Sequence, residues 1–297
     1  PTDLMAEHYG ARAQAGLIVA EGAWPEVDGQ AYCRQPGIAT PAHIQGWRCV
    51  TDAVHQRGGR IVLQIMHSGR IGSRRRHAAQ VVDVQVHPSG VVELECRVQG
   101  AWKHRAGQFV FLTLQTGEGH HPFTLVNADT GDGRLRFAIK ALGDYTARLA
   151  QQVAVGQQVW VEGPYGRFDF RQDRAPEQVW VAAGIGATPF VAWLESLVAN
   201  PAQAPVVQLH YCVRNAQEAV FAERMQQLCA QLPSVTLHIH HSDVTGKVAA
   251  DALLASAGPQ ASVWFCGPQG FGQALRDTMQ RLGRGQGRFH QELFQMR

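Results

Sequence analysis

The stretch Val179-Trp-Val-Ala-Ala-Gly-Ile-Gly-Ala-Thr-Pro-Phe190 decides the fold of this chain. Its apolar start predicts a short buried strand, and Gly184 and Gly186 predict a tight turn, because glycine adopts backbone conformations that other residues avoid. We expect Thr188 to cap the helix that follows and Pro189 to occupy its first position. A helix start offers free N–H groups to a phosphate, so the stretch predicts a nucleotide pyrophosphate site. A plain structural turn is the alternative.

Strands and helices alternate along the rest of the C-terminal part. The predicted strands are Gln178–Ala182, Val206–Val213, Val235–His240 and Ser262–Cys266, and the predicted helices are Thr188–Val198, Ala216–Cys229, Val248–Ala255 and Phe271–Leu282. This alternation is typical of an α/β doubly wound parallel sheet, which binds ligands at the carboxyl ends of its strands. Arg214 follows the second strand, with no carboxylate before Glu218, so the sequence favours NADPH over NADH. Arg214 as a surface residue or a pyrophosphate contact remains an alternative.

The middle of the chain shows a different pattern. The predicted strands are Gln80–Val86, Val91–Val98, Gln108–Leu114, Phe123–Val126, Arg134–Lys140 and Gln158–Glu162. Their alternation and glycine-rich turns predict a small antiparallel β-barrel. Three stretches stand out: His121-Pro-Phe-Thr124, Ile139-Lys-x-x-Gly-Asp-Tyr-Thr146 and Gly163-Pro-Tyr-Gly-Arg-Phe168. Taken singly, each is also consistent with barrel core, a helix cap or a turn.

In this order, and followed by Gly184-x-Gly186-x-Thr188-Pro189, these stretches resemble the ferredoxin–NADP⁺ reductase superfamily. The His-Pro-Phe-Thr form resembles its ferric reductase and NADPH oxidase branch. The resemblance implies an FAD-binding barrel domain over residues 74–174 and an NAD(P)H-binding domain over residues 175–297. The implied FAD contacts are His121, Pro122, Phe123, Thr124, Ile139, Lys140, Gly143, Asp144, Tyr145, Thr146 and Gly163. A histidine replaces the arginine of plant-type reductases at the first motif position, so we expect Lys140 to bind more of the pyrophosphate charge.

The resemblance extends to the end of the chain. Cys266-Gly267-Pro268 resembles the Cys-Gly-Pro that lies beside the nicotinamide, and Glu292 and Phe294 match the residues that approach the flavin and nicotinamide rings. The implied catalytic residues are therefore Thr124, Cys266, Glu292 and Phe294. The implied nucleotide contacts are Gly184, Gly186, Thr188, Pro189, Arg214, Cys266, Gly267 and Pro268. On residue type alone, Cys266 and Phe294 are equally consistent with core packing.

The first 73 residues belong to another pattern. A helix over Tyr9–Ala15, a strand over Ala15–Ala20, a helix over Pro41–Arg57 and a strand over Arg60–Met66 predict a βαβ unit of a parallel sheet or barrel. The motifs His8-Tyr-x-x-Arg12, Gly16-Leu-Ile-Val-Ala-Glu21 and Leu63-Gln-Ile-Met-His-x-Gly-Arg70 resemble the old yellow enzyme family, FMN-dependent ene-reductases built on a TIM barrel. The resemblance implies that Gln64 contacts the flavin. It covers a partial barrel only, so we expect a fragment that is dispensable for the chemistry.

Composition excludes several other classes. The 297 residues are 45% hydrophobic and 17% charged, which is typical of a soluble protein of two or three domains. A net charge of +3 is too small to indicate nucleic-acid binding. The chain opens with polar residues, and its longest uncharged run, Val179–Leu194, is short for a membrane span of about 20 residues. We therefore expect a cytoplasmic protein with no membrane span in this chain.

Cysteine and histidine spacing argues against a metal site. The six cysteines form no C-x-x-C pair, and the clusters His120-His121 and His238-x-His240-His241 lack helical zinc spacing. Redox chemistry must then come from an organic cofactor.

The sequence therefore predicts an FAD-dependent NAD(P)H oxidoreductase. It would pass hydride from nicotinamide to flavin and electrons onward to a small-molecule or haem-protein acceptor. One alternative is an FMN-dependent ene-reductase, with FMN bound only by the old yellow enzyme-like relic. Another is a non-catalytic electron-transfer module or an inactive fusion.

Overall fold

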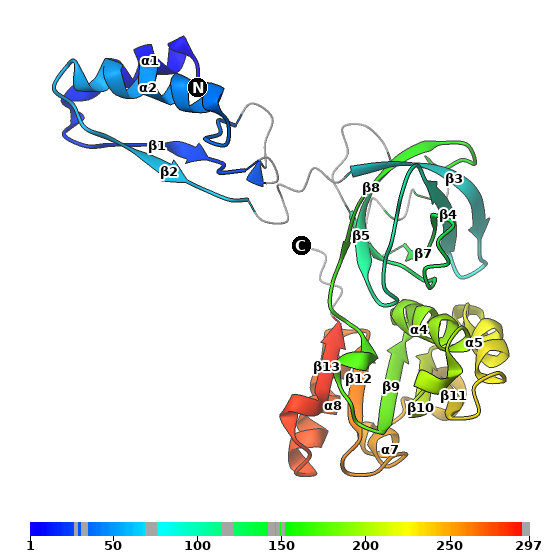
Figure 1. Cartoon of the computed structure of the whole chain (residues 1–297). Coiled ribbons are helices and arrows are strands. Elements are labelled where there is room, and N and C mark those ends of the chain that lie inside the picture. Colours follow the sequence, from blue (N-terminus) through cyan, green and yellow to red (C-terminus); the bar gives the residue numbers. More distant parts are fainter. Residues whose placement is uncertain are drawn as a thin grey trace. The chain divides into compact units, whose positions relative to one another are not determined.

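The computed structural model describes residues 1–26, 29–30, 35–68, 76–114, 121–141, 146, 149 and 152–292. The chain divides into two compact units, Pro1–Arg76 and His77–Arg297. Figure 1 labels the helices and strands of both units.

The first unit is a βαβ layer. Strands β1 (Ile18–Ala23) and β2 (Ile61–Ile65) pair in parallel, and helices α1 (Asp3–Gly10) and α2 (Pro41–His55) pack on one face of this sheet. The parallel βαβ prediction is confirmed. The predicted helix over Tyr9–Ala15 is wrong, because α1 begins after its N-cap Thr2 and ends at Gly10, a weak helix former. Residues Ala13–Ala15 form a short 3₁₀ helix instead.

The barrel of the second unit has six strands in the order β6-β5-β8-β3-β4-β7. Their bounds are β3 (Arg76–Val86), β4 (Val91–Val98), β5 (Phe109–Thr113), β6 (His121–Thr124), β7 (Arg134–Lys140) and β8 (Gln158–Tyr165). The described pairings β3–β4, β4–β7, β5–β6 and β5–β8 are antiparallel. The antiparallel fold is confirmed, but β6 begins two residues earlier than predicted. Pro122, which has no N–H to donate, is tolerated there because β6 ends the described strand order.

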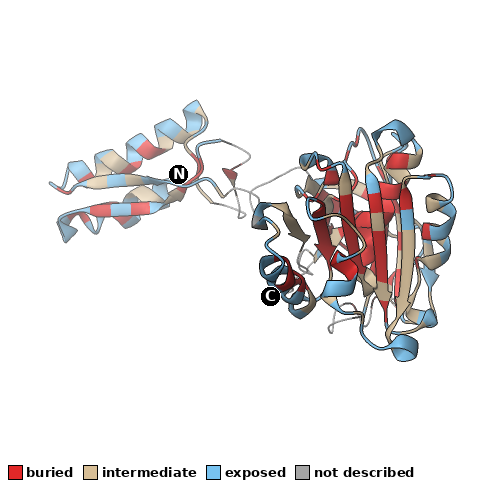
Figure 2. Ribbon diagram, turned by 90° about the horizontal axis from the view of Figure 1, so that it is seen from below, coloured by how far each residue is buried: buried red, intermediate tan, exposed pale blue. Residues whose placement is uncertain are grey.

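The nucleotide-type sheet has the parallel order β11-β10-β9-β12-β13. Its strands are β9 (Glu177–Ala183), β10 (Val206–Val213), β11 (Val235–His241), β12 (Ser262–Cys266) and β13 (Phe289–Glu292). Helices α4 (Thr188–Val198) and α5 (Ala222–Cys229) cover one face, and α7 (Ala250–Leu254) and α8 (Gln269–Arg281) cover the other (Figure 1). The doubly wound prediction is confirmed. Figure 2 shows the central strands almost entirely buried.

Two elements of this sheet differ from the predictions. The predicted helix over Ala216–Cys229 is broken: Asn215 caps a 3₁₀ turn over Ala216–Glu218 by accepting from the Glu218 N–H, and α5 starts only at Ala222. Strand β13 had no counterpart in the predicted set. The segment Asp144–Gln151, for which the sequence also predicts a helix, lies mostly outside the described residues.

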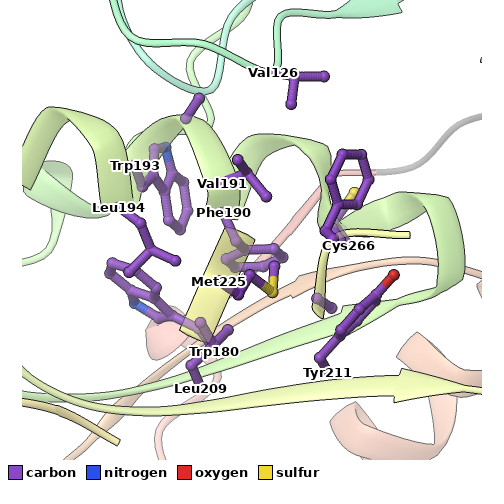
Figure 3. Packing of buried hydrophobic residues seen from close by; sticks show 14 of the residues in the cluster. Val126, Trp180, Phe190, Val191, Trp193, Leu194, Leu209, Tyr211, Met225 and Cys266 are labelled. Carbon is purple, nitrogen blue, oxygen red and sulfur yellow. The ribbon is translucent and has the colours of Figure 1, made fainter. Parts of the chain in front are cut away.

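Large aromatic side chains fill the core between α4 and the sheet (Figure 3). Trp193 of α4 lies with its ring centroid 5.0 Å from Trp180 of β9 and 5.0 Å from Phe190. Phe168, which follows β8, stacks on Trp193 at 4.8 Å, and the Trp193 indole N–H donates to the Ala106 carbonyl of the barrel. The barrel and the parallel sheet therefore share one hydrophobic core.

Candidate functional site

A cleft of about 960 Å³ lies at the carboxyl ends of β9, β10, β11 and β12. This is the edge at which doubly wound sheets bind their ligands. Among the residues lining it are Lys140, Gly184, Gly186, Arg214, Glu218, His240, Lys247, Gly267 and Pro268. Predicted nucleotide contacts from three different strand ends thus come together in one cavity, whereas Thr188, Pro189 and Cys266 are not among its lining residues.

The two glycines of the turn after β9 serve different purposes. Gly184 has φ of +55°, and a Cβ there would meet nothing within 4 Å. Gly186 would place a Cβ 2.3 Å from the Cys266 carbonyl oxygen, closer than real side chains come to backbone. Glycine at 184 therefore permits the bend of the turn, and glycine at 186 lets the turn pack against the end of β12.

Thr188 does not cap helix α4, so that prediction is wrong. Residues Gly184–Ala187 form a 3₁₀ turn that runs directly into the helix, which makes Ala187 the N-cap and leaves Thr188 already helical at φ −50° and ψ −50°. Thr188 is 2% exposed, and its hydroxyl has no hydrogen-bond partner within the described residues. A buried hydroxyl without a partner is unfavourable, but Thr188 is not among the residues that line the cleft. Pro189 lies in the first turn of α4.

Positive charge gathers around the cleft. Arg214 lies exposed beyond β10, and its guanidinium makes no hydrogen bond or ion pair with any part of the chain that the structure describes. The Asp243 N–H donates to the Arg214 carbonyl at 2.9 Å, which holds the end of β10 against α6 (Ser242–Thr245). Lys140, from the end of β7, reaches across to Glu218, with Nζ and Oε2 3.3 Å apart. Arg214 and Lys247 therefore remain available to phosphate groups.

Cys266 and Glu292 lie side by side on neighbouring strands, in register between β12 and β13. Burial raises the pKa of the Cys266 thiol well above its usual range, and the Glu292 carboxylate adds to that rise. Burial also raises the pKa of the Glu292 carboxyl. The thiol is therefore neutral, and the carboxyl holds its proton more readily than an exposed glutamate does. Phe294, the fourth predicted catalytic residue, lies outside the described residues.

The predicted flavin motif forms strand β6. Thr124 is 6% exposed, and its hydroxyl forms no hydrogen bond within the described part of the chain. It pairs with Phe109 of β5, whose ring contacts those of Phe111 and Tyr165 at 5.7 and 5.9 Å. These three rings are partly exposed. Flat aromatic faces beside an unpaired hydroxyl fit an isoalloxazine ring system, so the residues present are compatible with FAD.

The other residues predicted to contact FAD lie in the barrel, at its edge or outside the described residues. Ile139 is buried in the barrel core, so only its backbone remains for a cofactor. Lys140 engages Glu218 and lines the nucleotide cleft. The ring of Phe123 packs against the barrel core, and Pro122 is exposed beside the partly buried His121. Gly143, Asp144 and Tyr145 lie outside the described residues, Thr146 is buried, and Gly163 lies within β8.

Gln64 belongs to the first unit. It lies in β2 with an exposed side chain, in register with Gly22 of β1.

Most of the residues that line the cleft were missed from the sequence, among them His240, Lys247 and Glu218. The pattern His238-x-His240 did carry a signal, because residues two apart on a strand share one face. Within the described ranges, no group of three or more His, Cys, Asp or Glu side chains is arranged to hold a metal ion.

The described residues contain no helix with the length and apolar character that a bilayer crossing requires.

Three family models match the chain. Residues 1–105 match the NADH:flavin oxidoreductase / NADH oxidase family, residues 76–169 an FAD-binding domain, and residues 180–277 an oxidoreductase NAD-binding domain. The two domains that the site requires, one for FAD and one for NAD, are therefore both present.

Individual relatives, like the family models, each match only part of this chain. The ferredoxin–NAD⁺ reductase component of the Xanthobacter autotrophicus alkene monooxygenase system is 33% identical over 158 residues, 52% of this chain and 48% of that protein. A flavin oxidoreductase of Emericella nidulans is 46% identical over 71 residues, 24% of this chain and 18% of that protein. The chain thus spans about half the length of the Xanthobacter relative and less than a fifth of the Emericella relative.

A solved structure of an FAD/NAD-binding domain is also similar to this chain. The FAD/NAD-binding domain of nitric oxide dioxygenase from Vibrio cholerae is 26% identical, with a TM-score of 0.62, over 73% of this chain and 98% of that chain.

Proposed function

We propose that this chain, whose residues 76–277 belong to the ferredoxin–NADP⁺ reductase superfamily and follow an old yellow enzyme segment, is an FAD-dependent NAD(P)H oxidoreductase. Hydride would pass from the nicotinamide to the flavin, and electrons onward to an acceptor. The observation that carries the proposal is the cleft at the carboxyl ends of the parallel strands, in which Gly184, Arg214 and Gly267 come together.

The protein groups would bind and orient rather than react. FAD, when bound, supplies a two-electron acceptor that releases electrons singly. Thr188 and the turn at Gly184 would hold the nucleotide at the end of β9, and Thr124 would donate a hydrogen bond at the flavin edge. Cys266 and Glu292, adjacent on β12 and β13, would close the site with a neutral thiol and a carboxyl whose pKa is raised by burial.

One relative and one sequence motif bear on the electron acceptor. The Xanthobacter relative is named as a reductase component of an oxygenase system, which supports an iron-containing protein as the acceptor. The His121-Pro-Phe-Thr124 motif supports the finer proposal of a ferric reductase-like enzyme with a small-molecule or haem acceptor. We propose NADPH as the preferred donor, on the basis of Arg214 at the end of β10.

Domain bounds and location complete the proposal. We assign the FAD-binding domain to residues 74–174 and the NAD(P)H-binding domain to residues 175–297, after a partial old yellow enzyme-like segment over residues 1–73. The described cysteines are unpaired, which supports a reducing, cytoplasmic location.

The visible spectrum and acceptor range of the purified chain test the proposal. We expect released FAD, and NADPH oxidation coupled to ferricyanide or ferric citrate. Released FMN with reduction of cyclohexenone would instead support an ene-reductase. A colourless protein without NAD(P)H oxidation would indicate a non-catalytic module.

The role of Thr124 is tested by Thr124→Ala, with Thr124→Ser as the matched control that keeps the hydroxyl. We expect FAD to remain bound and the rate of flavin reduction by NADPH in stopped flow to fall about tenfold, the contribution of one hydrogen bond. The serine variant should recover most of the rate. Equal rates in the alanine variant and the unmodified protein would remove Thr124 from the mechanism.

A further inference from the structure

Three histidines form a column on one face of the parallel sheet, in which His210 is hydrogen-bonded to His240 and stacked on His238. His210 of β10 is 3% exposed, and its Nδ1 lies 3.0 Å from Nε2 of His240 on β11. The His210 ring also stacks on His238, with centroids 4.7 Å apart. His238 in turn contacts Gln208 through its Nε2, at 2.8 Å. The column runs along the sheet and ends at His240, which lines the nucleotide cleft.

Ser256, just beyond α7, fixes the proton positions in this column. Its hydroxyl donates to the Leu253 carbonyl at 2.6 Å, so towards His210 it can only accept. Nε2 of His210, 2.9 Å away, must therefore carry the hydrogen, and Nδ1 of the neutral ring is then an acceptor.

The acceptor nitrogen of His210 also fixes which nitrogen of His240 carries a hydrogen. Its Nε2 must donate to His210, whichever charge His240 carries. Its other nitrogen, Nδ1, has no partner within the described residues and is the atom left for a ligand. It is an acceptor when the ring is neutral and a cationic donor when the ring is protonated. His240 can thus change charge without breaking the column.

The place of His240 in the sheet indicates which part of a bound nucleotide it would contact. The pyrophosphate belongs at the turn after β9, and the end of the second strand, here Arg214 after β10, receives the ribose and its 2′ substituent. Strand β11 lies next to β10 on the side away from β9, and His240 occupies its carboxyl end. Arg214 and His240 therefore flank the adenosine end of the cleft.

We propose that His240 is a proton-linked contact for the ribose 2′-phosphate, with His210 and Ser256 as positioning residues that hold its ring. Binding of a 2′-phosphorylated nucleotide would draw one proton from solvent onto Nδ1 of His240. The same nitrogen, when neutral, would accept from a free ribose hydroxyl. Acid conditions would thus favour NADP(H), and neutral conditions would reduce that preference. The inference rests on the proposed nucleotide site, and it adds proton coupling and its residues.

Burial, followed by the neighbouring His238, lowers the pKa of His240, so its ring is neutral at pH 7 in the free protein. The other titratable or charged groups around it are His210, Cys212 and Arg214 from β10, His241 from β11, and Asp243 and Lys247 from α6 and the segment that follows it. The Asp251 carboxylate of α7 is engaged by Arg281. A bound phosphate therefore adds the negative charge that raises the pKa of His240 and draws the proton in.

Calorimetric titration of the FAD-loaded full-length protein with NADP⁺ and NAD⁺ tests the proposal. Titrations at pH 6 and pH 8, in buffers of different ionisation enthalpy, give the affinity and the number of protons taken up. The 2′-phosphate itself titrates at about pH 6. The result is therefore the difference in proton uptake between the unmodified protein and the variant. We expect His240→Gln, which can still donate to His210, to lower NADP⁺ affinity about fivefold at pH 6 and little at pH 8. NAD⁺ affinity should change less.

Two further variants separate positioning from packing. His238→Gln removes a stacked imidazole that does not line the cleft. Because His238 helps to lower the pKa of His240, we expect proton uptake on NADP⁺ binding to persist in this variant, with its midpoint shifted to higher pH. Ser256→Ala frees the His210 tautomer, and we expect less proton uptake on NADP⁺ binding although the cleft residues are intact.

Equal proton uptake by the unmodified protein and His240→Gln, with both nucleotides still bound, would overturn the inference and leave the proposed function standing. Failure to bind either nucleotide would overturn both.

Discussion

The two units of the chain both contain parallel strands joined through a helix, but they cover those strands differently. In the second unit, helices lie on both faces of the sheet, and Val179 and Trp180 on opposite faces of β9 are both fully buried. In the first unit the helices cover one face, and Val19 of β1 and Val62 of β2 are 60% and 48% exposed. Parallel sheets are normally buried on both faces. Stability and the candidate site are therefore concentrated in the second unit.

The largest contrast is expected from core truncation. Trp193→Ala should lower the free energy of unfolding of the second unit by about 3–5 kcal/mol, because it opens a cavity among Trp180, Phe190 and Phe168. Val62→Ala in the first unit is the control, and its half-exposed side chain should cost well under ~1 kcal/mol. Differential scanning calorimetry of both variants gives the two values. Similar losses would mean that the two sheets are equally well packed.

Acid is expected to act next most strongly, through His210. Burial, then His238 and His240, lower the pKa of His210 to about 3, against 6.5 for the free side chain. The unfolded chain therefore binds a proton on this histidine that the folded chain does not bind. The contribution of His210 to the free energy of unfolding is complete above pH 6.5 and is lost as the pH falls towards 3. Between pH 7 and 5 the loss from this residue should be about 2 kcal/mol.

Denaturant titrations at pH 5 and 7 measure that loss, and His210→Gln should shrink it. A pH dependence unchanged in His210→Gln would contradict the buried neutral state of the ring.

A smaller effect is expected at the turn after β9. In Gly186→Ala the new Cβ would collide with backbone at Cys266, so the turn must move away from β12. We expect nucleotide affinity to fall about tenfold, or ~1.4 kcal/mol. Gly285→Ala, where a Cβ meets nothing within 4 Å, is the matched control. Fluorescence titration with NADP⁺ gives both affinities, and equal values would show that the turn adapts without loss.

The smallest effect is expected from removing the first unit. Deletion of residues 1–73 should leave the rate of NADPH oxidation with ferricyanide within about twofold, because every described residue of the cleft belongs to the second unit. Steady-state assays of the full and shortened chains decide this. A large loss would give the first unit a part in the reaction.

The fold was readable from the sequence wherever hydrophobic periodicity was strong. Helix α4 and strands β4, β7, β10 and β12 begin and end where the pattern of apolar residues predicted. The pattern was weaker near Ala216, where an asparagine cap produced a 3₁₀ turn, and at Thr188, where a 3₁₀ turn displaced the expected cap. Both differences arise from local hydrogen bonding that competes with the helix.

The site was readable where a motif lies in one short stretch, as at Gly184 and Gly186. It was not readable where the contact joins distant segments. The pair of Lys140 with Glu218 joins residues 78 apart, and no motif indicated it; the contact of Lys140 with FAD phosphates stays a prediction. The bond from His210 to His240 depends on the register of β10 with β11, which periodicity alone does not set.

The shared core described around Trp193 has a consequence for how this protein can be divided. Glu195 of α4 accepts hydrogen bonds from Arg136 of the barrel, from Arg224 of α5 and from the Ala128 N–H, so one carboxylate joins both halves of the second unit. Separating the barrel from the parallel sheet would leave the Glu195 carboxylate without its barrel partners and expose the tryptophan cluster to water. The barrel and the sheet are therefore two domains by topology but one cassette for transfer: they can be moved together into another chain, and not separately.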